Sequence, residues 1–340
     1  QPLYGLLSDC LPLFGYRRKS YLSLFALGAF GAYISLFFVT APSAIFIALM
    51  VVAVCMAAGS TITGAVMVEN GKRYGLSGTL INQQWLWFNV AALFISYGAG
   101  WLSQRYGANS AYHVAALCAA AAPLVVLVSA WVLIPEERSK SDLKALRARV
   151  ADLGQALRSR TVWLVGGFLV LYNFSPALGT PLFYHMTNVL HFQQQFIGSL
   201  GSFAAVGAIA GALLFQVLQR YLTMRALLYL SISLATLGHF SYLLLQSELS
   251  AMVLAAGNGI IGMIVLVSSL TLAADSCPDG SEGFSYAMLT SLATLSYMLS
   301  SNLGAHMYDG LFHTQIAPLI VISAVCTALA LPVVPMLRLG

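Results

Sequence analysis

Near its start the sequence reads Gly5-Leu-Leu-Ser-Asp9-Cys-Leu-Pro12-Leu-Phe-Gly15-Tyr-Arg17-Arg18-Lys19, and a long apolar run, residues 20–39, follows directly. An apolar helix end, an acid, a proline–glycine turn and three cations are typical of a short cytoplasmic loop between two membrane spans. Small residues let helices approach closely, and basic residues hold such a loop on the cytoplasmic side. The stretch therefore predicts a membrane protein with several spans.

The composition of the whole chain supports this interpretation. Of the 340 residues, 59% are hydrophobic and 8% are charged, whereas a soluble domain carries about 25% charged residues. Several apolar runs are continuous and exceed about 18 residues, the length at which a helix crosses a bilayer. Because lipid cannot satisfy backbone polar groups, such runs form helices. We therefore predict an all-α protein in the lipid bilayer, and we interpret the net charge of +5 as a topology signal rather than a sign of nucleic-acid binding.

The apolar runs predict about ten complete membrane spans after an opening stub. They are residues 20–39, 43–68, 79–102, 110–134, 161–187, 197–218, 222–245, 249–274, 283–305 and 314–337. With the first loop in the cytoplasm, alternation places every one of the 16 Lys and Arg residues except Arg105 on the cytoplasmic side. This distribution follows the positive-inside rule, so we expect both ends of the sequence in the cytoplasm.

One segment, residues 135–160, differs from the rest because it is rich in charge. Its apolar residues recur at helical spacing, which predicts an amphipathic helix on the inner membrane surface. This linker would join an N-terminal half, residues 1–134, to a C-terminal half of six helices, residues 161–340. Only four spans and a stub precede it, and the chain starts at Gln1 rather than Met. We therefore expect a fragment of a twelve-span protein that lacks the first span and most of the second.

The span at 79–102 carries amides beside indoles. Asn82, Trp85 and Asn89 share one helix face because they are spaced i, i+3 and i+7. Amides and indoles together suit a flat heteroaromatic ligand, which makes Asn89 a candidate for substrate binding. The alternative is an aromatic belt at the membrane interface, with amides bonding between helices.

The span at 161–187 has the strongest signal for a cavity. At its middle it reads Tyr172-Asn173-Phe-Ser175-Pro176-Ala-Leu-Gly179-Thr180-Pro181. Two prolines and a glycine interrupt backbone hydrogen bonding, and broken helices in membranes usually line a cavity. A plain proline kink is the alternative. We select Tyr172, Asn173 and Ser175 as candidate substrate-binding residues, and Tyr184 further along the same span.

The span at 283–305 carries a polar stripe. Thr290, Thr294, Tyr297 and Ser301 fall on one helix face, which we expect to point into the helix bundle. Of these, Thr294, Tyr297 and Ser301 join the candidate substrate-binding residues. Charged residues near the predicted loops are candidates for gating, because ion pairs between helix ends can hold one side of a transporter shut. They are Asp9, Arg17, Arg18, Glu69, Asp275 and Glu282.

Several stretches resemble the folate–biopterin transporters of the major facilitator superfamily. Gly5-x-x-x-Asp9 followed by basic residues resembles the loop signature of the superfamily. Residues 2–19, 172–211 and 275–285, the last including Cys277-Pro-Asp-Gly-Ser-Glu-Gly283, resemble the folate–biopterin family within it. Residues 64–69 retain the alanine and glutamate of a family motif as Ala65 and Glu69, but Ser60 and Gly64 stand where the motif has two acids.

The resemblance implies a major facilitator fold and import of pteridines such as biopterin, or of folate, across the plasma membrane. It also implies alternating access coupled to protons. No Lys or Arg lies deep in a span to pair with the carboxylates of folate, so an uncharged pterin fits these residues better. No acid or base lies at the centre of a complete span, so proton coupling would need the absent segment or His239.

No phosphate-binding loop, zinc-protease motif or nucleophile elbow occurs, so we expect no enzyme activity, no cofactor and no metal. The expected partner is a small-molecule substrate, and the expected state is a monomer. Two alternatives stay open: a facilitator for another small solute, and a receptor-like or defective relative that does not transport.

Overall fold

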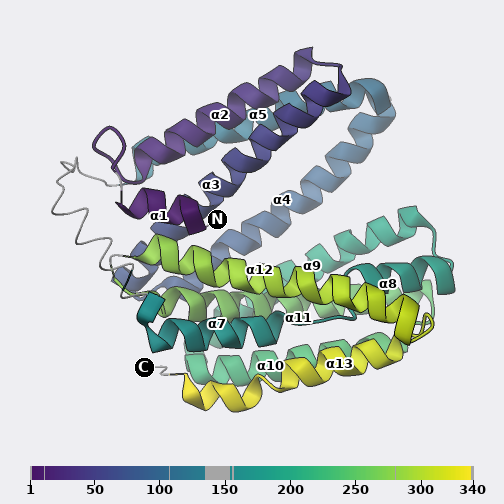
Figure 1. The fold of residues 1–340 in the computed structure, drawn as a ribbon. Coiled ribbons are helices and arrows are strands. Elements are labelled where there is room, and N and C mark those ends of the chain that lie inside the picture. Colours follow the sequence, from purple (N-terminus) through teal and green to yellow (C-terminus); the bar gives the residue numbers. More distant parts are fainter. Residues whose placement is uncertain are drawn as a thin grey trace. The chain divides into compact units, whose positions relative to one another are not determined.

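A computed structural model describes residues 2–10, 12–106, 108–134, 154, 157–279 and 281–337 (Figure 1). Throughout these residues the secondary structure is helical, apart from turns and one isolated bridge between Leu13 and Tyr16. The predicted all-α class is confirmed. The predicted linker, residues 135–160, lies almost entirely outside the described residues, so the proposed halves 1–134 and 161–340 stay a prediction.

The α-helices have the following bounds: α1 Pro2–Cys10, α2 Lys19–Phe38, α3 Pro42–Tyr74, α4 Ser77–Tyr106, α5 Ala108–Leu133, α7 Arg160–Asn173, α8 Thr180–Tyr184, α9 Gln194–Tyr221, α10 Met224–Ser241, α11 Glu248–Asp275, α12 Glu282–His306 and α13 Ala317–Ala328. Four short helical segments extend some of them. They are the π-helical η1 (His185–Val189) and η3 (Met307–Leu311), and the 3-10 helical η2 (Tyr242–Leu244) and η4 (Leu331–Met336).

Seven of the ten predicted spans coincide with helices that are long and apolar enough to cross a membrane. Within the described residues these helices are Lys19–Phe38, Pro42–Tyr74, His113–Leu133, Phe196–Tyr221, Met224–Leu244, Glu248–Asp275 and Ala317–Met336. The other three predicted spans correspond to α4, to the interrupted α7 and α8, and to α12. An interruption shortens the helical pieces, and α4 and α12 carry many amides and hydroxyls. The count of ten spans therefore stays a prediction.

The chain forms two compact units. The first consists of Gln1–Asn70, Ile95–Arg158 and Cys277–Met288. Within it α2 and α5 lie side by side (Figure 1), and Tyr21, Leu22, Ile62 and Ala130 form a buried cluster. Helix α1 meets the start of α12 where a Cβ at Gly5 would lie 2.5 Å from the carbonyl oxygen of Gly283. Only glycine permits such a close approach of two backbones.

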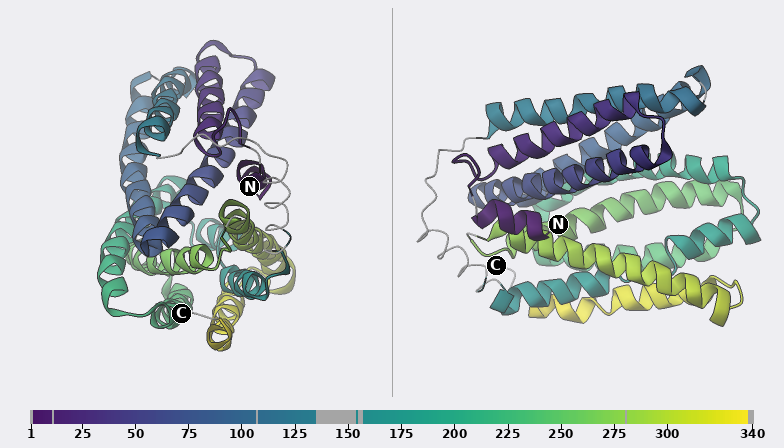
Figure 2. Two further views of the ribbon diagram at one scale, coloured as in Figure 1. Left: turned by 90° about the vertical axis from the view of Figure 1, so that its left-hand side faces the viewer. Right: turned by 45° about the horizontal axis from the view of Figure 1, so that its top comes forward.

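The second unit consists of Gly71–Phe94, Ser159–Ser276 and Leu289–Gly340. Its helices α9 and α11 pack through small residues, because a Cβ at Gly207 or Gly259 would collide with the backbone of Ala256 or Ala204 on the other helix. Helix α10 lies beside α11 and α13, which Figure 1 labels and Figure 2 shows from two further sides. This packing places α10 and α13 next to the interruption between α7 and α8.

The loop after α1 is fixed by a tight turn. Leu13 and Tyr16 exchange two backbone hydrogen bonds of 3.0 Å each, and Phe14 and Gly15 between them both have positive φ. Two positive φ values are the mark of a hairpin-type turn, which glycine adopts at no cost. The turn presents Arg17, Arg18 and Lys19 at the start of α2.

Candidate functional site

The interruption between α7 and α8 lies in the second unit and spans Phe174–Gly179. Helix α7 ends at Asn173, and α8 begins at Thr180 with Pro181 in its first turn. Gly179 has φ of 81°, in the left-handed region that glycine tolerates best. The break therefore falls within the stretch Tyr172 to Pro181 for which the sequence predicts it.

Serine hydroxyls from two neighbouring helices satisfy the backbone of this interruption. On α12, Ser300 Oγ accepts from the N–H of Ser175 at 3.1 Å, and Ser301 Oγ accepts from the N–H of Thr180 at 3.2 Å. On α13, Ser323 Oγ accepts from the N–H of Ala177 at 2.9 Å. Each hydroxyl replaces a partner that an unbroken helix would have supplied. Such replacement is what a broken helix needs in lipid.

An imidazole completes this polar cluster. His239 of α10 places Nε2 3.1 Å from Ser175 Oγ and 3.3 Å from Thr327 Oγ1 of α13. Ser175 thus contacts α12 through its backbone and α10 through its side chain. We refer to Ser175, His239, Ser300, Ser301, Ser323 and Thr327 as the hydroxyl–histidine cluster.

Four of the predicted substrate-binding residues lie at or beside this interruption. Ser175 and Ser301 belong to the cluster. A Cβ at Gly179 would lie 3.2 Å from the hydroxyl oxygen of Tyr297, which is 42% exposed. Tyr172 is buried in the last turn of α7, where its ring stacks on Phe168 with centroids 5.3 Å apart. Ser175, Tyr297 and Ser301 thus lie around the interruption, and Tyr172 lies just before it in the last turn of α7.

For the other four predicted substrate-binding residues, no hydrogen bond with this cluster is found among the described residues. The side-chain amides of Asn89 and Asn173 donate to carbonyls of their own helices, those of Trp85 and Leu169. Thr294 is exposed and likewise donates to its own helix. Tyr184 is 38% exposed and lies on α8 beside Phe183. Their role in binding stays a prediction.

Sequence reasoning missed most of the hydroxyls that hold the interruption. Ser296 and Ser300 are spaced i, i+4 on α12, and Ser323 and Thr327 are spaced i, i+4 on α13. Ser296 Oγ donates to the carbonyl of Val170, 2.6 Å away. Repeated hydroxyls at this spacing on an apolar helix are a signal that could have predicted them. The amide of Asn82 bonds between helices, donating to the carbonyl of Ala212 at 2.9 Å, as the alternative interpretation of that span anticipated.

Two predicted gating residues of the first unit, Arg18 and Glu69, form a partly buried ionic contact. Arg18 is 3% exposed and bonds to Ser8 on α1 and to the carboxylate of Glu69 on α3. Lys19 lies over the rings of Tyr16 and Trp131, with its ammonium 5.7 and 5.6 Å from their centroids. Arg17 is half-buried. Asp9 lies on α1, and its side chain is outside the described part of the chain.

Two predicted gating residues flank the loop between α11 and α12. Glu282 occupies the first turn of α12, where a carboxylate favours the positive end of the helix dipole. Asp275 ends α11 and forms a side-chain hydrogen bond with Ser77, the first residue of α4. Asp275 also lines a cavity of about 380 Å³ together with Lys72, Gln219 and Thr271. These groups lie at helix ends, as gating residues would.

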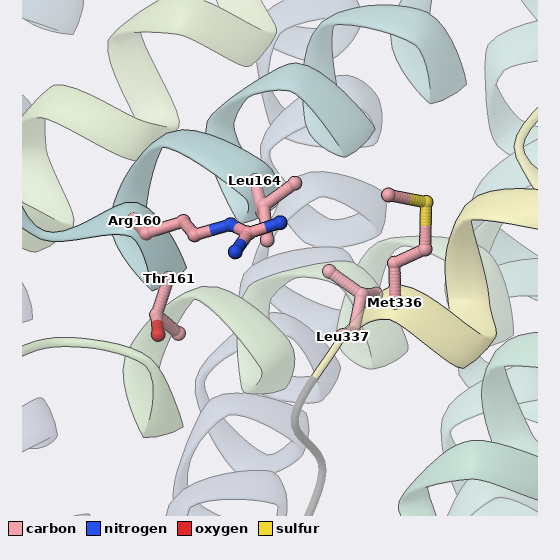
Figure 3. A pocket seen from close by; sticks show the side chains of 5 residues that line it. All are labelled: Arg160, Thr161, Leu164, Met336 and Leu337. Carbon is pink, nitrogen blue, oxygen red and sulfur yellow. The ribbon is translucent and has the colours of Figure 1, made fainter.

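A second cavity, of about 290 Å³, lies at the start of α7 (Figure 3). Arg160, Thr161 and Leu164 line it from α7, and Met336 and Leu337 line it from the end of the chain. It contains none of the predicted site residues. Among the described residues, no three His, Cys, Asp or Glu side chains gather in a way that could hold a metal ion.

Comparison with a solved structure defines the class of protein. The human organic anion transporter MFSD10 (TETRAN) has a TM-score of 0.72 with this chain at 16% identity, covering 98% of this chain and 79% of its own. This chain therefore shares the fold of that transporter. Together with its apolar helices, this fold makes the protein a multi-pass membrane protein.

The BT1 family profile matches residues 1–339, and the chain belongs to the BT1 family. A folate-biopterin transporter from Synechocystis is 27% identical to this chain, over 100% of the chain and 72% of the relative. Folate transporter 2 from Plasmodium falciparum is 22% identical, over 87% of the chain and 66% of the relative. The resemblance noted from the sequence is confirmed, and the protein is a transporter of this family.

Proposed function

We propose that this protein imports pteridines such as biopterin, or folate, by alternating access coupled to protons. The single observation that carries the proposal is the interruption between α7 and α8, with Tyr297, Ser301 and Ser175 gathered around it. Transporters commonly build substrate sites from discontinuous helices near the middle of the membrane. Relatives named as folate-biopterin and folate transporters support the choice of substrate.

The chemistry of these residues favours a pterin over a carboxylate-rich ligand. A pterin ring carries several hydrogen-bond donors and acceptors on a flat aromatic system, which hydroxyl and phenol groups can match. In the described helices α7 to α13, Lys, Arg, Asp and Glu occur only in the turns near helix ends. The glutamyl tail of folate would therefore meet no fixed cation here. We rank biopterin above folate as the substrate.

The remaining parts of the proposal concern topology. We place the protein in the plasma membrane as a monomer, with both ends of this sequence in the cytoplasm. The basic residues concentrate on one set of loops, which supports this orientation. In it, the Arg18–Glu69 contact lies on the cytoplasmic side and would act there as a gate.

Uptake competition tests the proposed substrate. The purified protein is reconstituted in liposomes, and uptake of labelled biopterin is measured against unlabelled biopterin, folic acid, an amino acid and a nucleoside. We expect biopterin to compete most strongly and folic acid more weakly. Competition by the amino acid or the nucleoside, with none by any pterin, would instead show a facilitator for another solute.

One observation favours a receptor-like alternative. Gly64 stands where the motif of the folate–biopterin family has an acid. A Cβ at Gly64 would lie only 3.2 Å from the ring of Tyr286. The space next to this position is therefore occupied by an aromatic ring. Saturable biopterin binding to the purified protein, without uptake into liposomes, would support a receptor.

A further inference from the structure

We propose that the imidazole of His239 is the group that takes up and releases the coupling proton. This inference rests on the proposed function and assigns its proton coupling to one residue. Three features support this assignment: the partners of the ring, the charges around it, and the connection from Ser175 to the interruption.

The partners of His239 suit both protonation states of the ring. Nε2 lies 3.1 Å from Ser175 Oγ and 3.3 Å from Thr327 Oγ1. A hydroxyl can donate to a bare ring nitrogen and can accept from a protonated one. Proton uptake therefore requires only rotation of hydroxyl hydrogens and leaves Nε2 paired in either state. A carbonyl or an ammonium in the same place would fit one state only.

In the described helices that contact α10, Lys, Arg, Asp and Glu occur only near helix ends. The titratable groups of the elements that contact α10 include Tyr242 of η2 and Cys326 of α13, and Tyr172 lies in the last turn of α7. The acids of α11, Glu248 and Asp275, are its first and last residues, and Arg220 lies one residue before the end of α9. The α11 residue that approaches α10 nearby is Asn258, whose amide donates to Ser241 at 3.0 Å. Without a carboxylate partner, the imidazolium is not trapped, and its proton can leave again.

The proton step has a direct mechanical connection to the broken helix. Ser175 is the second residue of the interruption, and its N–H is bound by Ser300 of α12. In the tautomer with a bare Nε2, protonation of that nitrogen makes it a donor, and a Ser175 hydroxyl that donated to it then accepts instead. The hydrogen of that hydroxyl then needs a new acceptor in the interruption or on a bound substrate. Proton binding and the conformation of the break are thereby linked.

The experiment uses the reconstituted protein and three variants. His239→Gln removes the titratable group and keeps a hydrogen-bonding side chain, His306→Gln is a matched control at an exposed histidine, and Thr327→Val removes one partner of the ring. Biopterin accumulation in an imposed pH gradient is compared with biopterin exchange at equal pH on both sides. We expect His239→Gln to lose the gradient-driven accumulation and to retain exchange, with His306→Gln unchanged. Gradient-driven accumulation by His239→Gln at the wild-type level would overturn the proposal.

A substrate-independent measurement separates this inference from the proposed function. In the purified protein labelled with ¹⁵N-histidine, the His239 signal is identified by its absence from His239→Gln, or by its shift in Thr327→Val if the glutamine variant does not fold. We expect this signal to shift as the pH is lowered and the ring takes up a proton. A signal that stays unchanged at every pH at which the protein stays folded rejects His239 as the proton site. Absence of pterin uptake with a titrating His239 would reject the substrate alone.

Discussion

The hydroxyl of Ser300 on α12 accepts a hydrogen bond of 3.1 Å from the backbone N–H of Ser175. Together with Ser301 and Ser323, it satisfies three donors that the interruption of the helix would otherwise leave unpaired. The hydrocarbon core of a bilayer contains no water that could accept from these donors in place of the three serines. The broken conformation therefore depends on side chains that belong to other helices.

Replacing Ser300 by alanine should destabilise the protein by about 1–3 kcal/mol, the cost of leaving a buried donor without a partner. The melting temperature of the purified protein in detergent measures this loss. Ser199→Ala is the matched control, because Ser199 is exposed and its hydroxyl donates only to Phe196 of its own helix. Equal melting temperatures for the two variants would show that the Ser300 bond contributes nothing.

Replacing Gly304 by alanine should also disturb the interruption. A Cβ at Gly304 would collide with the carbonyl of Pro176, and backbone atoms cannot rotate away. Overpacking of this kind costs about 1–3 kcal/mol, and we expect lower uptake as well. Gly262→Ala on α11 is the control, since a Cβ there meets open space and alanine improves helix propensity. Uptake and stability of Gly304→Ala matching those of Gly262→Ala would contradict the close contact.

The contact between Arg18 and Glu69 should matter for stability. Glu69→Gln removes a carboxylate that pairs with Arg18, a guanidinium that is 3% exposed. Breaking a fully buried pair costs about 3–5 kcal/mol, but Glu69 is 33% exposed, so we expect about 2 kcal/mol. Detergent-solubilised protein is assayed by thermal unfolding.

A control variant and a double variant test whether the loss of stability comes from the contact between Arg18 and Glu69. Arg225→Gln, at an exposed arginine on α10, should change the unfolding temperature little. The double variant Arg18→Leu/Glu69→Leu should be less destabilised than the sum of the two single leucine variants, because each single variant already removes their contact. Additive losses would show that the two side chains do not interact.

Asn173→Leu and Tyr297→Leu test the predicted substrate-binding face. Asn173 donates only to its own helix, and Tyr297 is 42% exposed, so both changes should leave the fold and the membrane insertion intact. If each side chain binds substrate, biopterin uptake should fall about tenfold, equivalent to about 1.4 kcal/mol. Asn302→Leu is the control, because its amide also bonds to its own helix. Wild-type uptake in both variants would assign these residues to packing.

The sequence predicted the class, the family and the position of the broken helix. Long apolar runs indicate helices regardless of tertiary context, and Pro176, Gly179 and Pro181 together disfavour a regular helix at this point of the chain. Such local and compositional signals are readable from one chain. The same holds for Glu282 in the first turn of α12.

The partners of the interruption could not be predicted in the same way. Ser300, Ser323 and Thr327 look like ordinary hydroxyls in apolar helices until the packing of α12 and α13 brings them to Phe174–Gly179. Conversely, Asn89 and Thr294 resemble binding residues, yet each bonds to a carbonyl of its own helix. Hydroxyls and amides have this choice between local and distant partners, and only the tertiary structure resolves it.

The small-residue contact between α9 and α11 has a practical consequence for spectroscopy. Gly207 and Gly259 bring the two backbones together without flexible side chains between them, so this helix pair should keep its spacing while other elements move. Two probes, one on α9 and one on α11, should therefore keep a constant distance that serves as a reference. Distances from these two probes to a probe on α8 would then report the motion of the broken helix during a transport cycle.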